Sequence, residues 1–401
     1  MSDGSDSLPK EGLNRREFLS ASAVPIAAAA LSGSKLAAEG SRATIPSQDV
    51  IRLGFIGAGA NVRNVMIPRL LESPGVELLA VANRSLESSQ RAADEVGISR
   101  AYSHWEELLR DDDVDAVVIG TWPYMHRTLT LASLEAGKHT LCQARMANTA
   151  QEARDMLEAS LRYPHLVSQL VPTSTSYAID NVIMEHVDGG FFGEVLSVEI
   201  QRLLRDTRAT LARTGPNGFA HVGGDLLWRH NRQYSGYNIL NIGSTMESMI
   251  RWFGRGTRVM AMTKVHVPYR YLDGKRTSVT IPDHVDVMYE LMNGAQAHMR
   301  FSASTGHSNG NQTWIYGTEG TLHVDEESRI FAGRKSDSGL SEVPNGPERR
   351  VPRIVERQFI NAIRGTEEVT MVPFETGVHY MEFTEAVTLS ARSGQAVYLP
   401  L

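Results

Sequence analysis

The sequence predicts an α/β protein with a parallel sheet in its first half and an open, mostly antiparallel sheet in its second half. Between residues 50 and 170, short apolar runs alternate with stretches of helical spacing, which is typical of a parallel sheet with helices on both faces. After about residue 170 the apolar runs lengthen, alternate with polar residues and are separated by glycine, proline or Asn-Gly. With 401 residues, of which 42% are hydrophobic, the chain is long enough for two packed domains.

The first forty residues differ from the rest of the chain. The sequence NRREFL at 14–19 precedes an alanine-rich apolar stretch, which is typical of a twin-arginine (Tat) export signal. This stretch is shorter than the roughly 20 residues that span a bilayer, so we expect no stable membrane insertion. We therefore predict an export leader at 1–40, with cleavage near Ala37 or Ala38, and a polar linker at 41–49. The expected location is periplasmic or otherwise exported, with the Tat machinery as a partner; the alternative is a tail with a chance arginine pair.

Residues 50–170 form the first predicted domain. Each predicted strand is a short, mainly apolar run, and each predicted helix repeats apolar residues three or four positions apart. The predicted strands are Ile51–Ile56, Val76–Ala82, Val114–Gly120 and His139–Cys142, and the predicted helices are Val65–Leu71, Leu86–Val96, Thr128–Ala136 and Ala150–Arg162.

Residues 171–401 form the second predicted domain. Its strands are predicted from partial apolar alternation, and a hairpin turn is predicted at Met292-Asn293-Gly294. The predicted strands are Glu194–Gln201, Arg258–Val267, Ser278–Glu290, Ala295–Ser304 and two short strands within Ile315–His323, and the closing helices are Arg353–Ile363 and Thr376–Ala391.

A glycine-rich loop follows the first predicted strand and opens a helix. Gly57 and Gly59 match the first two glycines of a G-x-G-x-x-G loop, whose backbone amides hold the pyrophosphate of a dinucleotide. Ala60 and Asn61 complete the loop, and Val62 stands where the third glycine would be. That glycine normally lets helix and strand pack closely. Val62 therefore implies that the helix packs in a slightly different position, and it does not imply that phosphate binding is lost. A plain strand–helix turn without nucleotide is the alternative.

The end of the second predicted strand bears on the choice between NAD and NADP. An acidic residue there would bind the ribose 2′-hydroxyl and repel a 2′-phosphate. This chain has Asn83 and Arg84 instead, and an arginine can hold a phosphate. These residues favour NADP or no discrimination, unless Arg84 is an ordinary surface cation.

Several segments, in order and spacing, resemble the Gfo/Idh/MocA oxidoreductases over about residues 50–401. They are IRLGFIGAGA, LLAVANRS, DVDAVVIGTWPYMH, LEAGKHTLCQARMANT, FFGEVLSVEI, NIGSTMESMIRWFG, IYGTEGTLHV and AVTLSARSGQAVYLP. The resemblance implies a Rossmann domain, then an α/β domain whose open sheet often forms an oligomer interface, so a homo-oligomer is expected. It implies NAD or NADP as cofactor and sugars, cyclitols or their derivatives as substrates. It also places Thr121, Pro123, His126 and Gln143 beside the cofactor.

Two positions depart from the pattern of the family. Members usually carry Glu-Lys-Pro where this chain has Gln143-Ala144-Arg145, and the lysine assists proton transfer. They also carry Asp-Ile-Gly-x-His where this chain has Asn241 at the start and Thr245 at the end. Threonine has no group that titrates near neutral pH, so it is no ordinary general base. Decay of the site and replacement by a different site both account for these changes.

A polar segment at 221–237 favours replacement, since it contains two His, two Arg, one Asp and two Tyr. We predict that Arg145 holds a substrate hydroxyl, carboxylate or sulfate, and that His230 or Tyr237 takes the proton. A solvated loop is the alternative. A second patch of hydroxyl side chains, residues 173–177, lies where the family often contacts substrate. His266, His284 and His298 are expected on the sheet surface, and His379 is a further candidate for the pocket.

These observations lead to one main function and two alternatives. The main prediction is an exported NAD(P)-dependent oxidoreductase that acts on a carbohydrate-like small molecule and holds its cofactor tightly. The alternatives are a redox-neutral glycoside hydrolase or lyase that oxidises its substrate transiently, and a non-catalytic nucleotide- or sugar-binding protein. The net charge of −6 does not favour a nucleic-acid partner, and no His or Cys spacing indicates a metal site.

Overall fold

The computed structural model describes residues 50–172, 177–203, 226–349 and 355–401. The predicted leader, its linker and the hydroxyl residues at 173–176 lie outside these ranges. Within them, no helix combines the length and apolarity that a membrane crossing requires.

The first half forms a six-stranded parallel sheet with the order β3-β2-β1-β4-β5-β6. Its strands are β1 (Ile51–Ile56), β2 (Val76–Ala82), β3 (Arg100–Tyr102), β4 (Ala116–Ile119), β5 (His139–Cys142) and β6 (Ser168–Leu170). Its helices are the π-helical turn η1 (Val62–Met66), α2 (Ile67–Leu70), α3 (Leu86–Val96), α4 (Trp105–Leu109), α5 (Pro123–Glu135) and α6 (Ala150–Arg162). The strand order reverses between β1 and β4, and ligands of such sheets bind at this switch point.

Both faces of this sheet are buried. Along β4, Val117 and Ile119 join one hydrophobic cluster, whereas Ala116 and Val118 join a second. A strand with two buried faces has no polar side, which is why the sequence shows continuous apolar runs here. Strands β1, β2 and β5 and helices α3 and α6 lie at the predicted residues, and α3 ends at Gly97, a left-handed C-cap with φ 77°.

Two predicted helices in this half need correction, and three short elements were missed. The helix predicted at Val65–Leu71 is divided, because η1 precedes α2 and α2 ends at Leu70. Helix α5 begins at Pro123, five residues before the predicted Thr128, since proline is well suited to the first helical position. The short elements β3, α4 and β6 were not predicted.

His139 gives the fold a testable dependence on pH. The side chain is 6% exposed, its Nδ1 accepts a hydrogen bond from the Val167 N–H at 2.9 Å, and burial lowers its pKa to about 4. The folded state therefore favours neutral His139, and this stabilisation is complete above pH 6.5. It is lost as the pH falls from 6.5 towards 4, because only the unfolded chain binds the proton in that range.

We expect the His139→Gln variant, which retains an acceptor, to flatten the pH dependence of stability. The wild type should lose up to about 3 kcal/mol more than the variant between pH 7 and pH 4. Urea unfolding of both proteins across this range measures the difference. Parallel stability curves would show that His139 does not titrate with folding.

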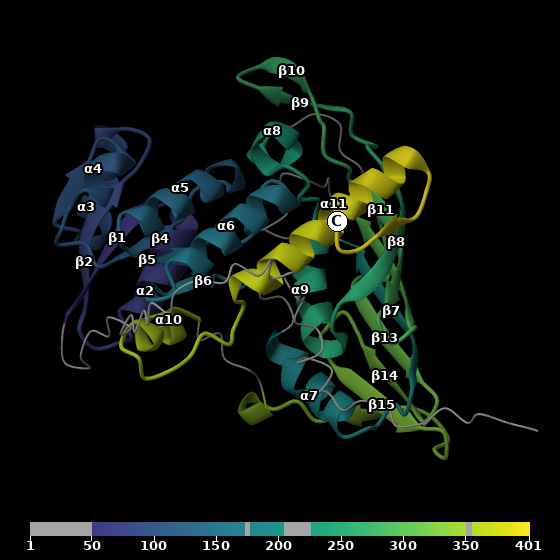
Figure 1. Cartoon of the computed structure of the whole chain (residues 1–401). Coiled ribbons are helices and arrows are strands. Elements are labelled where there is room, and N and C mark those ends of the chain that lie inside the picture. The colour runs from purple at the N-terminus through teal and green to yellow at the C-terminus, as the bar shows by residue number, and fades with distance from the viewer. Residues whose placement is uncertain (1–49, 173–176, 204–225, 350–354) are drawn as a thin grey trace, which may run out of the picture. The chain divides into compact units, whose positions relative to one another are not determined.

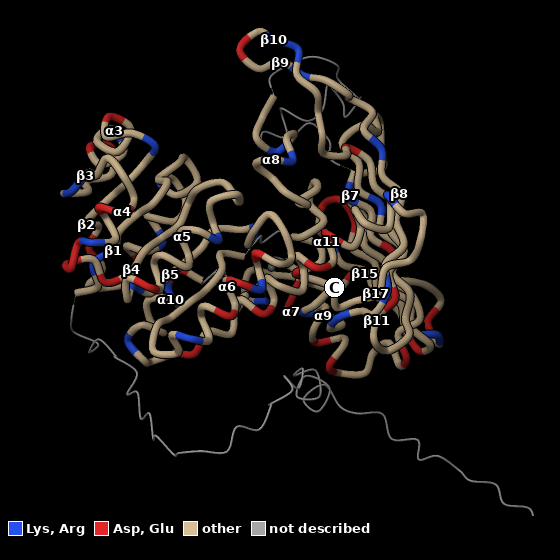
Figure 2. The backbone as a smooth tube through the Cα atoms, turned by 45° about the horizontal axis from the view of Figure 1, so that its top comes forward, with Lys and Arg blue, Asp and Glu red and all other residues tan. Residues whose placement is uncertain are grey.

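The second half forms a nine-stranded sheet with the order β16-β15-β14-β13-β7-β12-β11-β8-β17. Its central strand β7 pairs with β12 in parallel and with β13 antiparallel, and the other pairs are antiparallel. The strands are β7 (Val195–Leu203), β8 (Gly256–Lys264), β11 (His284–Leu291), β12 (Gln296–Ser302), β13 (Gln312–Gly317), β14 (Gly320–Val324), β15 (Ile330–Arg334), β16 (Ser341–Val343) and β17 (Val397–Tyr398), with a separate hairpin of β9 (Tyr269–Leu272) and β10 (Lys275–Ser278). The mostly antiparallel sheet confirms the predicted fold class. Acidic and basic residues are interspersed along both halves (Figure 2).

The long strand predicted at Ser278–Glu290 is wrong in its first part. Ser278 ends β10, and β11 begins only at His284. Between them, Pro282 cannot donate a ladder hydrogen bond, and the Asp283 carboxylate accepts hydrogen bonds from the backbone N–H groups of His266 and Val267. The missed elements are the hairpin β9–β10, strands β15, β16 and β17, the single turns η3 (Trp228–His230) and η4 (Pro347–Arg349), and helices α7 (Tyr177–Asp188), α8 (Arg232–Ser235) and α9 (Ile242–Phe253).

Two C-terminal helices, α10 (Val355–Ile363) and α11 (Phe374–Ser393), pack against the first half of the chain. Phe359 of α10 belongs to the same hydrophobic cluster as β1, and α11 lies alongside α6 (Figure 1). A Cβ on Gly377 of α11 would lie 2.4 Å from the Met146 sulfur, so only glycine allows this approach. The Met146 N–H donates to the Tyr380 hydroxyl at 2.6 Å. The end of the chain therefore completes the packing around the residues that follow β5.

Candidate functional site

The glycine loop after β1 has the geometry of a phosphate-binding turn. Gly57 has φ +84°, and a Cβ there would lie 2.8 Å from the Thr121 backbone nitrogen, so a side chain is excluded. A Cβ on Gly59 would meet no atom within 4 Å, so open space lies in front of this residue. Ala60 and Asn61 follow at the start of η1, where helix amide groups are available to an anion.

Val62, at the third glycine position, packs against the other loop of the switch point. A Cβ on Gly120, which follows β4, would lie 2.3 Å from Val62 Cγ2 and 2.6 Å from the Gly57 carbonyl oxygen. The glycine that permits close packing is therefore supplied by the β4 loop instead of the β1 loop. That Val62 shifts the position of the helix stays a prediction.

The two residues predicted to meet the adenosine ribose have different environments. The Asn83 side chain holds the glycine loop: its Oδ1 accepts from the Ala58 N–H at 2.8 Å, and its Nδ2 donates to the Ser88 carbonyl at 2.9 Å. With both ends of the amide engaged, Asn83 positions the loop. Arg84 is exposed beside it, and its predicted contact with a ribose or a 2′-phosphate stays a prediction.

The loop after β4 offers an orphaned polar atom to a ligand. Thr121 Oγ1 is buried and has no hydrogen-bond partner among the described residues, although buried hydroxyls are normally satisfied. Opposite it, Gln143 Nε2 donates to Asn61 Oδ1 at 2.7 Å and thereby joins the β5 end to the glycine loop. A hydroxyl without a partner, beside a glycine loop with open space, fits a bound dinucleotide. Pro123, the first residue of α5, fixes the end of the Thr121 loop.

His126 connects the loop after β4, which contains Thr121, to the loop after β5. Its Nε2 lies 3.0 Å from the Thr121 carbonyl oxygen, and its Nδ1 lies 3.0 Å from the Arg145 carbonyl oxygen. The side chain is fully buried, and burial lowers its pKa, whereas the carbonyl oxygens beside both ring nitrogens act in the opposite direction. We conclude that His126 positions two loops of the site.

Arg145 lies against the first turn of α9. A Cβ on Gly243 would lie 2.8 Å from Arg145 Cδ, and Arg145 Nε is buried without a hydrogen-bond partner among the described residues. Burial lowers the pKa of Arg145, because the charged guanidinium has lost water. The peptide bond between Ala144 and Arg145 is cis. A polar substrate group that accepted from Nε would relieve the desolvation cost.

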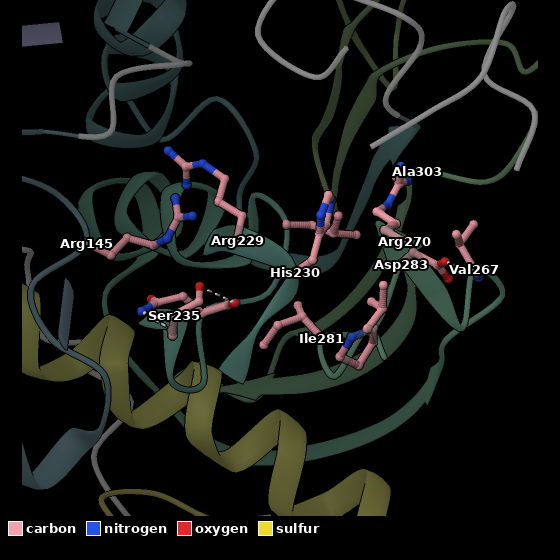
Figure 3. Close-up of a pocket in the computed structure, with 13 residues that line it drawn as sticks. Arg145, Arg229, His230, Ser235, Val267, Arg270, Ile281, Asp283 and Ala303 are labelled. Carbon is pink, nitrogen blue, oxygen red and sulfur yellow. Dashed lines mark hydrogen bonds between the residues drawn. The ribbon is translucent and has the colours of Figure 1, made fainter. Parts of the chain in front are cut away.

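The predicted site residues Arg145 and His230 line one cavity, although they are 85 positions apart in the sequence. Figure 3 shows them around it together with Arg229, Arg270 and Asp283. Three arginines and one aspartate give the described lining an excess of positive charge. This surrounding suits a substrate rich in oxygen atoms.

The hydrogen bonding of His230 defines its protonation. Its Nδ1 accepts from the Leu227 N–H at 3.0 Å, so the neutral ring carries its proton on Nε2. In this form Nε2 donates hydrogen bonds and cannot take a proton. The role of proton acceptor predicted for His230 would require this hydrogen bond to break.

Tyr237 is not among the residues that line the cavity, but its neighbours Ser235 and Asn238 are. Its N–H donates to the Asn148 carbonyl at 2.8 Å, which ties the segment to the loop after β5. Gly236 lies against the same residue, with a Cβ position only 2.1 Å from the Asn148 oxygen. The Arg232 guanidinium lies 5.2 Å from the centre of the Tyr237 ring.

Asn241 and Thr245 line a separate cavity with Arg202 and Ser248. Burial lowers the pKa of Arg202 to about 10. The two positions where the family usually has acid and base therefore face other surroundings than Arg145 does. The described residues contain no cluster of three His, Cys, Asp or Glu side chains that could hold a metal ion.

Four further histidines named from the sequence, His266, His284, His298 and His379, are not among the residues that line the Arg145 cavity. His284 contacts Ser302 and Asp286 on the sheet, and its ring meets that of His266 edge-on at 5.6 Å. His298 lies on the open face of the sheet. The Nδ1 atom of His379, on α11, lies 3.5 Å from Arg255 Nη1, and His379 does not line the cavity.

Four aromatic residues beside the cavity were missed in the sequence, and we call them the aromatic shelf: Trp122, Tyr124, Trp228 and Tyr234. The Trp122 and Trp228 rings stack at 5.9 Å and 16°, although 106 residues separate them. Tyr234 meets Trp122 and Tyr124 edge-on at 5.5 and 5.6 Å. The position of Trp122 next to a predicted cofactor residue, and the presence of Trp228 and Tyr234 in the polar segment 221–237, were the only signals in the sequence.

Two family models match the chain. The model described as an oxidoreductase family with an NAD-binding Rossmann fold matches residues 51–168, and the GFO/IDH/MocA C-terminal domain matches residues 182–323. The switch point of the first sheet lies within the first match, and the second match includes the arginines of the cavity other than Arg145.

Named relatives agree with these matches. Levoglucosan dehydrogenase of Pseudarthrobacter phenanthrenivorans is 25% identical over 73% of this chain and 78% of its own. The 1,5-anhydro-D-fructose reductase of Ensifer adhaerens is 38% identical over 27% of this chain and 32% of its own. A solved structure of levoglucosan dehydrogenase with NADH and L-sorbose superposes with a TM-score of 0.73 at 21% identity, covering 87% of this chain and 99% of that one. The chain belongs to the Gfo/Idh/MocA oxidoreductases, with an NAD-binding Rossmann domain followed by the C-terminal domain of the family.

Proposed function

We propose that this protein is an exported NAD(P)-dependent oxidoreductase that acts on a sugar or a sugar derivative. The observation that carries the proposal is the position of Arg145. Arg145 follows the usual lysine position, and its carbonyl contacts His126, which also contacts Thr121 in the loop after β4. Its buried Nε has no hydrogen-bond partner among the described residues. The dehydrogenase and reductase among the relatives act on anhydrosugars by name, which supports a carbohydrate substrate.

In the proposed reaction, Arg145 holds the oxygen of the substrate carbon that is oxidised or reduced. The nicotinamide ring, when bound, supplies or accepts the hydride. The guanidinium is a permanent donor, so it binds a hydroxyl in one direction and stabilises a carbonyl oxygen in the other. Its partial burial strengthens this contact, because fewer waters compete for the donor.

The proton is assigned to Tyr237 rather than to His230. His230 presents Nε2–H, which donates to a substrate oxygen without changing its own protonation. Tyr237 carries a hydroxyl that can give or take a proton, but it does not line the cavity, so this role requires its segment to move towards the substrate. Substituting Tyr237 by phenylalanine should therefore lower kcat, whereas His230→Gln should raise KM more than it lowers kcat.

The export proposal rests on the arginine pair at 15–16, which lies outside the described residues. An exported enzyme has no steady supply of nucleotide, so it would carry a tightly held cofactor that is reduced and reoxidised in each cycle. Purification without added nucleotide, followed by denaturation and mass spectrometry, tests this directly. Stoichiometric NAD or NADP supports the proposal, and a protein that is empty and fails to bind either nucleotide contradicts it.

Arg84 is proposed to bias the cofactor choice towards NADP. Replacing it with alanine should weaken NADP(H) binding about tenfold and leave NAD(H) binding nearly unchanged, because only the 2′-phosphate meets the guanidinium. Titration of both nucleotides by calorimetry measures the ratio. Arg91→Ala, which removes an exposed arginine on α3, is the control. An unchanged ratio would show that Arg84 is an ordinary surface cation.

We further propose a homo-oligomer formed through the open face of the second sheet. Met260 and Met288 are cross-strand partners on this face, and Met262 nearby is 78% exposed. Exposed apolar patches of this kind commonly mark protein contacts. Light scattering should give a multiple of the mass of the chain, and Met262→Glu combined with Met288→Glu should reduce it to the single-chain value. A monomeric wild type would overturn this part.

A further inference from the structure

We propose that the aromatic shelf binds the second ring of a glycoside whose first sugar ring is held by Arg145. This inference rests on the proposed function and names the class of substrate. It implies that the protein prefers a disaccharide or an aryl glycoside to a monosaccharide.

Two of the four rings of the shelf are exposed and the other two are half-buried, although aromatic side chains are costly to leave in water. Trp122 is 45% exposed and Tyr124 is 42% exposed. Both follow Thr121, which lies in the cofactor loop, so the exposed rings lie next to the proposed reaction centre. Exposed apolar surface beside a cavity of this kind marks a binding surface.

The rings of the shelf are held in place by one another. Tyr234 packs edge-on against both Trp122 and Tyr124, and Trp122 stacks on Trp228. The shelf comes from α5, η3 and α8, and helices α5 and α8 lie in contact (Figure 1). Because the rings are ordered by these contacts, little side-chain entropy would be lost when a ligand stacks on them.

The shelf is continuous with the Arg145 cavity. Arg229 lines that cavity, and its guanidinium lies 4.1 Å from the centre of the Trp228 ring. Ser235, next to Tyr234, also lines the cavity. The cavity itself has room for little more than one water molecule, so a sugar would lie at its mouth, and a molecule that extends from there on this side meets the shelf.

The chemistry of the shelf selects a flat ring as its occupant. Indole and phenol rings present an apolar face with a polar edge, which matches the apolar face and hydroxyl rim of a pyranose or the face of a phenyl group. A monosaccharide held by Arg145 would leave this surface in water. A glycoside places a second ring at the distance of one glycosidic bond, so the two parts of the site would be occupied together.

The test compares pairs of glycosides that differ only in the second ring. Methyl and phenyl β-glycosides and the corresponding β-linked disaccharides, in gluco, galacto and glucurono configurations, are titrated into the nucleotide-loaded protein by calorimetry. Quenching of tryptophan fluorescence is the second readout, because Trp122 and Trp228 would contact the ligand. The variants are Trp122→Ala and Trp122→Phe, with Tyr398→Ala as the control, since Tyr398 is 67% exposed on the distant strand β17.

We expect at least one phenyl glycoside or disaccharide to bind about tenfold more tightly than its methyl partner. Trp122→Ala should reduce this ratio to about one, Trp122→Phe should retain most of it, and Tyr398→Ala should leave it unchanged. Tighter binding of the disaccharide would assign the shelf to a sugar ring, and tighter binding of the phenyl glycoside to an aromatic aglycone.

Equal binding of all members of a pair would overturn the proposal, as would binding of none of them. A loss of nucleotide affinity in Trp122→Ala would also overturn it, because the shelf would then belong to the cofactor. The proposed function has its own readout: a protein that binds nucleotide and methyl glycosides, without preference for a second ring, retains that function and loses only the shelf.

Discussion

Replacing Arg145 with alanine should lower kcat/KM for the sugar substrate by about 10² to 10³. The variant loses a desolvated donor beside the first turn of α9, where a hydrogen bond to the reacting oxygen is stronger than in water. Nucleotide affinity should change little, because the glycine loop, Asn83 and Thr121 are left intact. Steady-state kinetics and nucleotide titration separate these two effects.

Two further variants sharpen this prediction. Arg145→Lys keeps the charge but loses the planar donor geometry, so it should recover only part of the activity. Arg91→Ala removes an exposed arginine and should behave as the wild type. If Arg145→Ala were as active as the wild type, the reacting oxygen would have to be held by another side chain of the cavity.

Replacing Gly236 with alanine should destabilise the protein by at least about 3 kcal/mol. Gly236 has φ 56° and ψ −130°, a conformation that residues with a Cβ avoid. The added methyl group would lie 2.1 Å from the Asn148 oxygen and 2.4 Å from its Cα, so it meets backbone rather than a movable side chain. To avoid this overlap with Asn148, the segment that contains Tyr237 would have to move away from the loop after β5.

Thermal unfolding measures this cost, with Gly339→Ala as the matched control. Gly339 is exposed, and a Cβ there would meet no atom within 4 Å. The control should keep the melting temperature of the wild type. If Gly236→Ala were equally stable, the contact with Asn148 would not be a fixed part of the fold, and the cavity would have to be described in another conformation.

The elements that sequence patterns predicted well have strong local signals. Strands β1, β2 and β5 are buried on both faces and appear as short apolar runs. Helices α3 and α6 begin at side-chain caps, where Ser85 and Thr149 accept hydrogen bonds from the N–H groups three residues on. A pattern confined to one segment is enough to find such elements.

The elements that were missed depend on distant partners. Strand β3 has only three residues, and the hairpin β9–β10 is largely exposed and charged, so neither shows an apolar pattern. Strand β3 forms by pairing with β2, whereas β9 and β10 pair only with each other across a two-residue turn. The predicted division of the chain at residue 170 stays a prediction, since α10 and α11 return to the first sheet.

The candidate site shows the same limit. The resemblance to the family identified Arg145 as a departure, and polar density identified His230, but no sequence pattern indicates that they share a cavity. The tautomer of His230 depends on a hydrogen bond from Leu227, and the partners of Asn83 are backbone atoms. Such contacts follow from how loops approach one another, which spacing along the chain does not encode.

The return of α10 and α11 to the first sheet has a consequence for the synthesis of the protein. The ribosome releases β1 to β6 first, but Phe359 and Tyr380, which cover apolar surface beside them, emerge only after strands β7 to β16. Until then the nascent nucleotide domain exposes part of its interior and is prone to aggregation and to capture by chaperones. A transcript truncated before residue 355 would leave that surface permanently uncovered, so quality control should degrade the shortened chain.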